Sequence, residues 1–202
     1  MKILQEIKYR RLNIETTPRC TLECSMCKRT TYFALHNTKV VPGDDLTPDN
    51  FKKILKFFKG PILFSGQISD PIFNKHFIEL LKLSGKSYKR GDKILHRSVN
   101  INTAATGRKK SWYEKAFLAN PNAIWTFGID GPPHLSHKYR KNQNGVFLFE
   151  MMKMARLMGI RAIWQYIIFK YNEKYIDECK SLAEKYGIKI SFIRSRRGSE
   201  NG

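Results

Sequence analysis

The hydrophobic and polar positions along this chain switch repeatedly between two periods. Residues 11–17, RLNIETT, alternate between polar and apolar side chains, which is typical of a half-buried strand. Residues 46–58 begin with Thr47 and Pro48, a helix start signal, and then place apolar residues at helical spacing. The same two patterns predict strands at 60–66, 94–103, 123–131, 161–169 and 188–194, and helices at 74–85, 111–120, 145–158 and 173–186.

This alternation predicts an α/β fold. Six strands separated by five helices imply right-handed crossovers and a parallel sheet, which either opens into a doubly wound fold or curls toward a barrel. Polar, glycine-containing stretches follow three of the strands, at 65–71 (SGQISDP), 102–107 (NTAATG) and 129–134 (IDGPPH). Parallel α/β proteins place their chemistry at the carboxyl ends of strands, so we expect the candidate sites to share one face.

Length and composition indicate one domain of ordinary size. The 202 residues are 42% hydrophobic, which is enough for a real core, and we expect a single domain over 1–202 with a flexible tail from about 196. The sequence contains no run of eighteen apolar residues, and its N-terminus lacks the pattern of a secretory signal. We therefore expect a cytoplasmic protein that has no membrane association.

The charge is strongly positive. A formal net charge of +20 would attract polyanions, which makes a nucleic acid or a nucleotide a candidate substrate. Lysine is scattered over every predicted helix, however, so a bias in composition explains much of the charge equally well. Charge alone does not choose between these two interpretations.

Three of the four cysteines, Cys20, Cys24 and Cys27, form the pattern C-x3-C-x2-C after the first predicted strand. A reducing compartment makes clustered thiols metal ligands more often than disulfide partners. A closed zinc site needs four ligands, and the nearest extra candidate is His36, whereas an iron–sulfur cube can leave one iron without a protein ligand. We favour the iron–sulfur interpretation over zinc. Cys179 lies on the apolar stripe of a predicted helix, and we expect it in the core.

The cysteine pattern and the order of elements resemble those of the radical S-adenosylmethionine (radical SAM) superfamily. Its signature is C-x3-C-x2-C in the loop after the first strand of a partial (βα)6 TIM-like barrel, and the resemblance covers essentially the whole chain. The segment CTLECSMCKR, at 20–29, looks like members with a Cys-x-Met-Cys ending, many of which modify peptides. In this resemblance the three cysteines are metal ligands, and Met26 packs near the cluster or the adenine of the cofactor.

Two further stretches are similar to motifs of that family. SGQISDPIF looks like the Gly-Gly-Glu-Pro motif that holds the methionine amino group of SAM, with Ser69, Asp70 and Pro71 in its last three places. The aspartate shortens the reach by one methylene, which leaves open whether Asp70 or a backbone carbonyl accepts from the ammonium. INTAATG resembles a Thr-Asn-Gly segment, with Thr103 matching and Ala104 in place of the asparagine.

A third stretch, FGIDG, looks like the Ser-x-Asp-Gly that ends the fourth strand in many members. Gly128 replaces the serine, and Asp130 occupies the end of the strand, facing the cofactor. Arg140 fits those members that place an arginine shortly after this motif. His134 and His137, between these two positions, could face a substrate, although loop histidines are more often solvated.

The resemblance implies two cofactors and a type of reaction. A 4Fe-4S cluster would reductively cleave S-adenosyl-L-methionine to a 5′-deoxyadenosyl radical, which abstracts hydrogen from an unidentified nucleic acid, nucleotide or peptide. Such an enzyme, an oxidoreductase or transferase, needs an electron donor of the flavodoxin or ferredoxin type, or a chemical reductant. We expect the substrate, a partner protein or a second copy of the chain to close the open side of the barrel.

Two other classes of function stay open. One is a non-catalytic zinc or iron–sulfur module that binds nucleic acid, which the charge favours and the βα repetition disfavours. The other is a degenerate barrel that binds SAM and a cluster as a sensor, suggested by the departures at Ser69 and Ala104. The basic run Arg194 to Arg197 could bind phosphates or form an ordinary tail.

Overall fold

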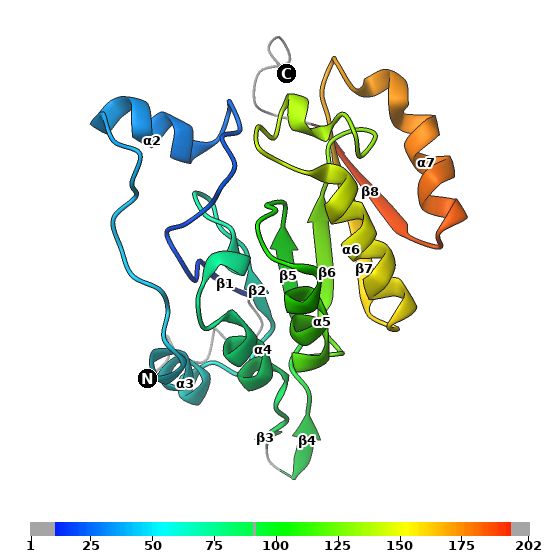
Figure 1. Ribbon diagram of the computed structural model, residues 1–202. Coiled ribbons are helices and arrows are strands. Elements are labelled where there is room, and N and C mark those ends of the chain that lie inside the picture. Colours follow the sequence, from blue (N-terminus) through cyan, green and yellow to red (C-terminus); the bar gives the residue numbers. More distant parts are fainter. Residues whose placement is uncertain (1–10, 91, 195–202) are drawn as a thin grey trace.

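The computed structural model describes residues 11–90 and 92–194, and its centre is a parallel sheet of six strands (Figure 1). The sheet has the order β1-β2-β5-β6-β7-β8, and each neighbouring pair is parallel. Its strands are β1 (Leu12–Ile14), β2 (Ile62–Phe64), β5 (Val99–Thr103), β6 (Ile124–Gly128), β7 (Arg161–Ile168) and β8 (Lys189–Arg194). Because the spatial order follows the sequence, the sheet is the predicted partial (βα)6 barrel, with β1 and β8 at its edges.

Helices join consecutive strands of this sheet. They are α2 (Lys28–His36), α3 (Pro48–Phe57), α4 (Phe77–Gly85), α5 (Lys110–Ala119), α6 (Gly145–Leu157) and α7 (Ile176–Lys185). The predicted start of α3 is confirmed, because the Thr47 side chain accepts a hydrogen bond from the Asn50 N–H at 3.3 Å and Pro48 is the first helical residue.

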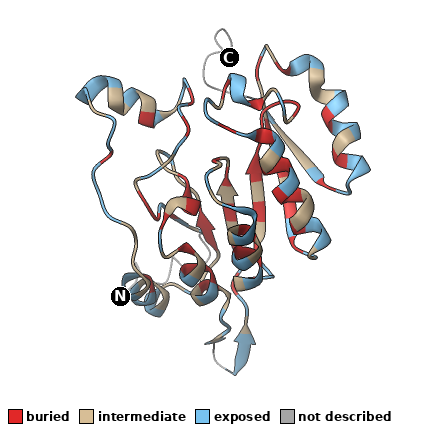
Figure 2. Cartoon of the chain, viewed as in Figure 1, coloured by how far each residue is buried: buried red, intermediate tan, exposed pale blue. Residues whose placement is uncertain are grey.

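The core lies between the strands and the inner faces of these helices (Figure 2). It is rich in aromatic side chains from elements far apart in the sequence. The rings of Phe64 and Phe77 lie 5.4 Å apart, and those of Phe117 and Trp125 lie 5.0 Å apart, each pair edge to face. Cys179 is 0% exposed on α7, which confirms its predicted place in the core.

One helix and one hairpin were not predicted. Helix α2 follows the cysteine loop and buries only Arg29, so it lacks the apolar stripe that reveals a helix in a sequence. Strands β3 (Tyr88–Arg90) and β4 (Lys93–Leu95) form an antiparallel hairpin outside the main sheet. The predicted strand 94–103 was therefore wrong at its start, because Ile94 and Leu95 pair within the hairpin and β5 begins at Val99.

Two further expectations concern the chain as a whole. None of the helices in the described part of the chain combines the length and the apolar character that crossing a bilayer requires. The tail from 196 lies outside the described residues, and of the basic run 194–197 only Arg194 is described, as an exposed residue at the end of β8.

Candidate active site

A cavity of about 330 Å³ opens at the carboxyl ends of the strands. Segments from all along the chain line it, namely the cysteine loop between β1 and α2, the loops after β2 and β5, and residues near the ends of β6 and β7. Seven of the nine predicted site residues are among its lining: Cys20, Cys24, Cys27, Ser69, Asp70, Thr103 and Arg140. The expectation that the candidate residues share one face is therefore met for these seven.

The three cysteines are free thiols on one loop. Cys24 is buried, whereas Cys20 and Cys27 are partly exposed to the cavity. Cys27 caps the N-terminus of α2, where the helix dipole favours negative charge, and its N–H donates to the Cys24 carbonyl at 3.1 Å. The hydroxyl of Thr30 donates to the same carbonyl at 2.8 Å, so the loop is fixed to the first turn of the helix.

Burial raises the pKa of Cys20 to about 12 and that of Cys24 to about 11. At Cys20 the carboxylate of Asp70 contributes to this rise in pKa, while the guanidinium groups of Arg29 and Arg140 oppose the shifts at Cys20 and Cys24 respectively. Ionising such buried thiols requires positive charge nearby, which a bound metal centre supplies.

The described residues contain no three His, Cys, Asp or Glu side chains placed to hold a single metal ion. In an iron–sulfur cube each thiolate binds a different iron, so its ligands surround a volume and do not meet at one point. The donors here are three thiols around one cavity, and their chemistry suits an iron–sulfur cube better than a single metal ion.

The loop after β2 makes a tight turn that is held from β1. One oxygen of Glu15 accepts hydrogen bonds from the Ile68 N–H at 3.0 Å and from the Ser69 hydroxyl at 2.8 Å. A Cβ at Gly66 would overlap the carbonyl and hydroxyl oxygens of Ser69, so glycine is required for this close approach. The turn therefore presents backbone groups to the cavity, and its Ser69 hydroxyl is engaged by Glu15.

Asp70 is buried, and its carboxylate is fully engaged by neutral donors. The Thr103 hydroxyl donates to both oxygens, at 2.9 and 3.1 Å, and the N–H groups of Ala104 and Ala105 donate at 2.8 and 2.9 Å. The Ile72 N–H adds a longer bond at 3.3 Å. Burial raises the pKa of Asp70, and these donors oppose that shift. The carboxylate thus ties the loop after β2 to the loop after β5.

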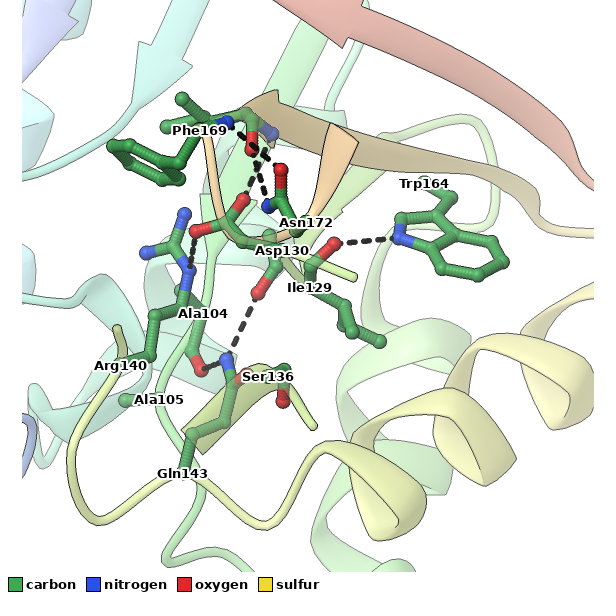
Figure 3. A network of polar contacts seen from close by, with 12 residues as sticks. Ala104, Ala105, Ile129, Asp130, Ser136, Arg140, Gln143, Trp164, Phe169 and Asn172 are labelled. Atoms are coloured by element: carbon green, nitrogen blue, oxygen red, sulfur yellow. Dashed lines mark hydrogen bonds and ion pairs between the residues drawn. The ribbon is translucent and has the colours of Figure 1, made fainter. Parts of the chain in front are cut away.

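Asp130 is not among the residues that line the cavity, but it contacts Arg140, which is (Figure 3). It is 0% exposed, and its Oδ2 pairs with the Nε of Arg140 at 2.8 Å, while its Oδ1 accepts from the Ile167 N–H at 2.8 Å. The Tyr171 hydroxyl donates to the Asp130 carbonyl at 3.1 Å. The acid therefore holds the guanidinium, and it is Arg140 that reaches the cavity.

The residue at 128 makes room for that guanidinium. A Cβ built at Gly128 would lie 2.9 Å from an Nη atom of Arg140 and 3.2 Å from the Cβ of Ala104. Serine, which stands here in the family pattern, would meet the same two groups. Two of the departures from that pattern, Gly128 and Ala104, therefore lie next to each other, and Gly128 lies next to the arginine.

Sequence reasoning missed two further polar side chains that hold the backbone of the site through hydrogen bonds. The amide of Gln143 donates to the carbonyls of Ala104 and Gly128, and so bridges the ends of β5 and β6 (Figure 3). Arg29, 8% exposed, donates to the carbonyls of Pro18 and Ile68. The basic pair after the last cysteine could have drawn attention to Arg29, but no pattern marks Gln143.

The remaining candidates lie outside the cavity. Met26 is 39% exposed and does not line it, and His134 and His137 are exposed residues of the loop after β6.

Trp164 and Asn172 support the backbone near Asp130 and the end of β7. The indole N–H of Trp164 donates to the Ile129 carbonyl at 2.7 Å, and the amide of Asn172 donates to the Ile167 carbonyl at 2.9 Å.

The sequence matches no protein-family model, and no curated protein matches it. Among solved structures, the fold is similar to SuiB of Streptococcus suis bound to S-adenosylmethionine, with a TM-score of 0.72 and 14% identity over 99% of this chain and 45% of that one. SuiB bound to its precursor peptide SuiA gives 0.69 and 15%, over 100% and 45%.

A third structure, anSMEcpe with bound AdoMet, has a TM-score of 0.63 and 17% identity, and the match covers 92% of this chain and 51% of that one. The present chain thus spans about half of the length of the solved structures that it resembles. At these identities the likeness establishes a shared fold. Two of these three structures contain S-adenosylmethionine, and one contains a peptide.

Proposed function

We propose that this protein is a radical SAM enzyme in which Cys20, Cys24 and Cys27 hold a 4Fe-4S cluster. The observation that carries the proposal is that three thiols from one loop line the same cavity as the ends of four parallel strands. Neighbours of the same fold that are solved with S-adenosylmethionine support a SAM site in this cavity. When bound and reduced, the cluster would supply the electron that cleaves SAM and yields the 5′-deoxyadenosyl radical.

The chain's own residues prepare the cavity for this chemistry. Arg140 presents a guanidinium beside Cys24, where its charge stabilises negative charge on the thiolates and attracts the carboxylate of the cofactor. Asp130 keeps that guanidinium in one position through the 2.8 Å ion pair. Because Asp130 is buried and already paired with the partly buried guanidinium before any ligand arrives, little reorganisation is needed on binding.

The amino group of the cofactor needs acceptors. Since Asp70 already accepts from five hydrogen bonds to Ile72, Thr103, Ala104 and Ala105, we assign this role to backbone carbonyls of the turn at 65–69. Asp70 and Thr103 then act as positioning residues that fix the turn against β5. Ser69 contributes through its backbone, because its hydroxyl is held by Glu15. Nothing in the cavity lining supports a contact between Met26 and the adenine.

Two substrate classes have support. A peptide is favoured by the likeness to SuiB, which is solved with a precursor peptide bound. A nucleotide or nucleic acid is favoured by the net charge of +20. Both belong in the first substrate screen, together with an external one-electron donor and with partner proteins that could cover the open edges of the sheet.

The first test is anaerobic reconstitution with iron and sulfide, followed by SAM and dithionite and by mass-spectrometric detection of 5′-deoxyadenosine. We expect about four irons per chain and deoxyadenosine from the wild type. Changing any one of the three cysteines to Ala should abolish cleavage, because each thiolate holds one corner of the cluster. The matched control is Cys179→Ala, a thiol removed from the core on α7, which should retain cleavage.

Other outcomes would decide for the alternatives. About one zinc per chain, with no iron, would replace the proposal with a zinc module. A bound cluster and bound SAM that are never consumed, with several reductants and substrates, would make the protein a sensor. A cluster that survives Cys24→Ala would contradict the ligand assignment itself.

A further inference from the structure

A second pocket lies at the opposite end of the sheet from the cavity. It has a volume of about 370 Å³ and lies between α3, α4 and the β3–β4 hairpin, near the amino ends of β2 and β5 (Figure 1). Five cationic side chains line it: Lys52, Lys56, Lys59, Lys86 and Arg97. None of its described lining residues is acidic. We call this group of residues the basic pocket.

Arg97 is the buried member of the basic pocket. It is 8% exposed, and one Nη donates to the Phe58 carbonyl at the end of α3 at 3.2 Å, while the guanidinium lies 5.1 Å over the Tyr88 ring. Its Nε has no hydrogen-bond partner, and no carboxylate forms an ion pair with it within the described part of the chain. A buried charge without a counter-ion is costly, so an external anion at this point would be stabilising.

Two lysines of α3 lie on one face of the helix, and a third follows its end. Lys52 and Lys56 lie at i and i+4, a spacing at which like charges repel each other, and Lys59 comes two residues after the last residue of α3. Asp49 pairs with Lys52 at 2.9 Å, and Lys59 donates to the Leu55 carbonyl, but Lys56 has no ion pair among the described residues. Lys56 and Lys59 interact favourably with the C-terminal end of α3, but neither has a carboxylate partner among the described residues, so a ligand with several negative charges would be attracted here.

Part of the lining of the basic pocket is apolar, and we call this part its floor. It consists of Leu55, Leu83 and Tyr88, which line the pocket together with the cationic side chains. A ligand that fits must therefore carry a flat apolar body between negative charges. Single-stranded nucleic acid has this chemistry, because each base can stack on an aromatic or apolar surface while the flanking phosphates meet basic side chains. The hairpin continues the positive surface with the exposed residues Lys89 and Lys93.

We propose that the basic pocket anchors single-stranded nucleic acid, with one base against Tyr88 and the leucines and its flanking phosphates on Lys56, Lys59 and Lys86. The site lies away from the cysteines, so it does not depend on the cofactor chemistry proposed above. It recruits a polynucleotide to the protein, and any reaction would take place elsewhere.

The test is fluorescence anisotropy of a labelled single-stranded RNA of twelve nucleotides with the full, cluster-reconstituted chain at several salt concentrations. The variant Lys56→Ala/Lys59→Ala/Lys86→Ala should lose at least about tenfold in affinity for the RNA. The plot of the logarithm of the association constant against the logarithm of the salt concentration has a negative slope, and its magnitude should decrease by about 2. The matched control, Lys180→Ala/Lys185→Ala/Lys189→Ala, removes the same charge from α7 and β8 at the far edge of the sheet and should change affinity less than twofold. Circular dichroism checks that both variants are folded.

A second variant tests the floor. Tyr88→Leu keeps apolar bulk but removes the π-face, and it should weaken RNA binding about fivefold. In a competition experiment, the affinity of pyrophosphate for the protein should be the same for this variant as for the wild type. Equal losses in the two lysine variants would overturn the proposal, because binding would then depend on net charge alone. Pyrophosphate or polyglutamate that binds the basic pocket where RNA does not would also overturn it, in favour of a small phosphate or an acidic peptide.

Discussion

Two buried aspartates lie at the cavity, and their carboxylates are stabilised in different ways. Asp70, after β2, receives only neutral donors, from one hydroxyl and three backbone N–H groups. Asp130, after β6, receives one backbone N–H and the guanidinium of Arg140. Both carboxyl groups are removed from water, and burial raises the pKa of each.

The difference shows what each acid is for. Neutral donors fix the position of the backbone that carries them, so Asp70 sets the geometry of the turn 70–72 and of the loop 103–105. An ion pair fixes a charge, so Asp130 sets the place of the guanidinium that reaches the cavity. Asp70 therefore fixes the backbone that lines the cavity, and Asp130 fixes the cation, Arg140, that lines it.

Replacing Asp130 should have the largest effect. Asp130→Asn leaves Arg140 buried without a counter-ion, and we expect the free energy of unfolding to fall by about 3–5 kcal/mol. Urea denaturation with a constant m-value measures this. The double variant Asp130→Asn/Arg140→Met removes both charges and should regain at least about half of the loss. Additive losses in the double variant would contradict the ion pair.

Asp70→Asn comes next. The amide nitrogen would face N–H and O–H donors, leaving at least one buried donor unsatisfied, and we expect a loss of about 3 kcal/mol in the free energy of unfolding. Because no cation is released, a second substitution at Arg140 should not rescue it. If Arg140→Met did restore stability here, the two networks would be one, and the comparison between them would fail.

Thr103→Val isolates one donor of the Asp70 network. The shape is kept and only the hydroxyl is lost, so a loss of about 1.5–2 kcal/mol is expected, as for a hydrogen bond to a charged group. Equilibrium unfolding measures the loss. Thr126→Val, a substitution of the same kind on β6, serves as the control for changing the residue type in a strand.

Tyr171→Phe should have the smallest effect. Its hydroxyl donates to the carbonyl of Asp130 and does not touch the carboxylate, so removing it should cost about 1 kcal/mol. Deoxyadenosine formation should stay within about twofold of wild type, because Arg140 keeps its partner. A loss as large as that of Asp130→Asn would show that the position of the backbone at 130 matters more than the ion pair.

Periodicity in the sequence predicted the sheet because each strand and crossover helix carries its own apolar pattern. Helix α2 and the β3–β4 hairpin were missed for the opposite reason. The first buries a single arginine, and the second exposes Ile94 and Lys93, so neither leaves a regular apolar pattern in the sequence. Elements that pack weakly against the core are invisible to a method that detects burial.

The site was predictable in its members but not in their contacts. The cysteine spacing, the strand ends and the resemblance to the family motifs indicated seven of the residues that line the cavity. The structure adds that the Asp70 carboxylate is occupied by hydrogen bonds from the end of β5 and the loop after it, and that Asp130 pairs with Arg140 and does not line the cavity. These contacts join segments more than thirty residues apart for Asp70 and Thr103, and the sequence carries no local trace of such pairings. Gln143 was missed for the same reason.

The close approach of Arg140 to the backbone of Gly128 has an evolutionary consequence. A Cβ at 128 would lie 2.9 Å from an Nη of the guanidinium, so a side chain there requires Arg140 to shift. Relatives with a side chain at 128 should carry a shorter residue at 140 or hold its cation from another direction. The two positions, twelve residues apart, are thus expected to vary together, and a collection of related sequences would show this as covariation.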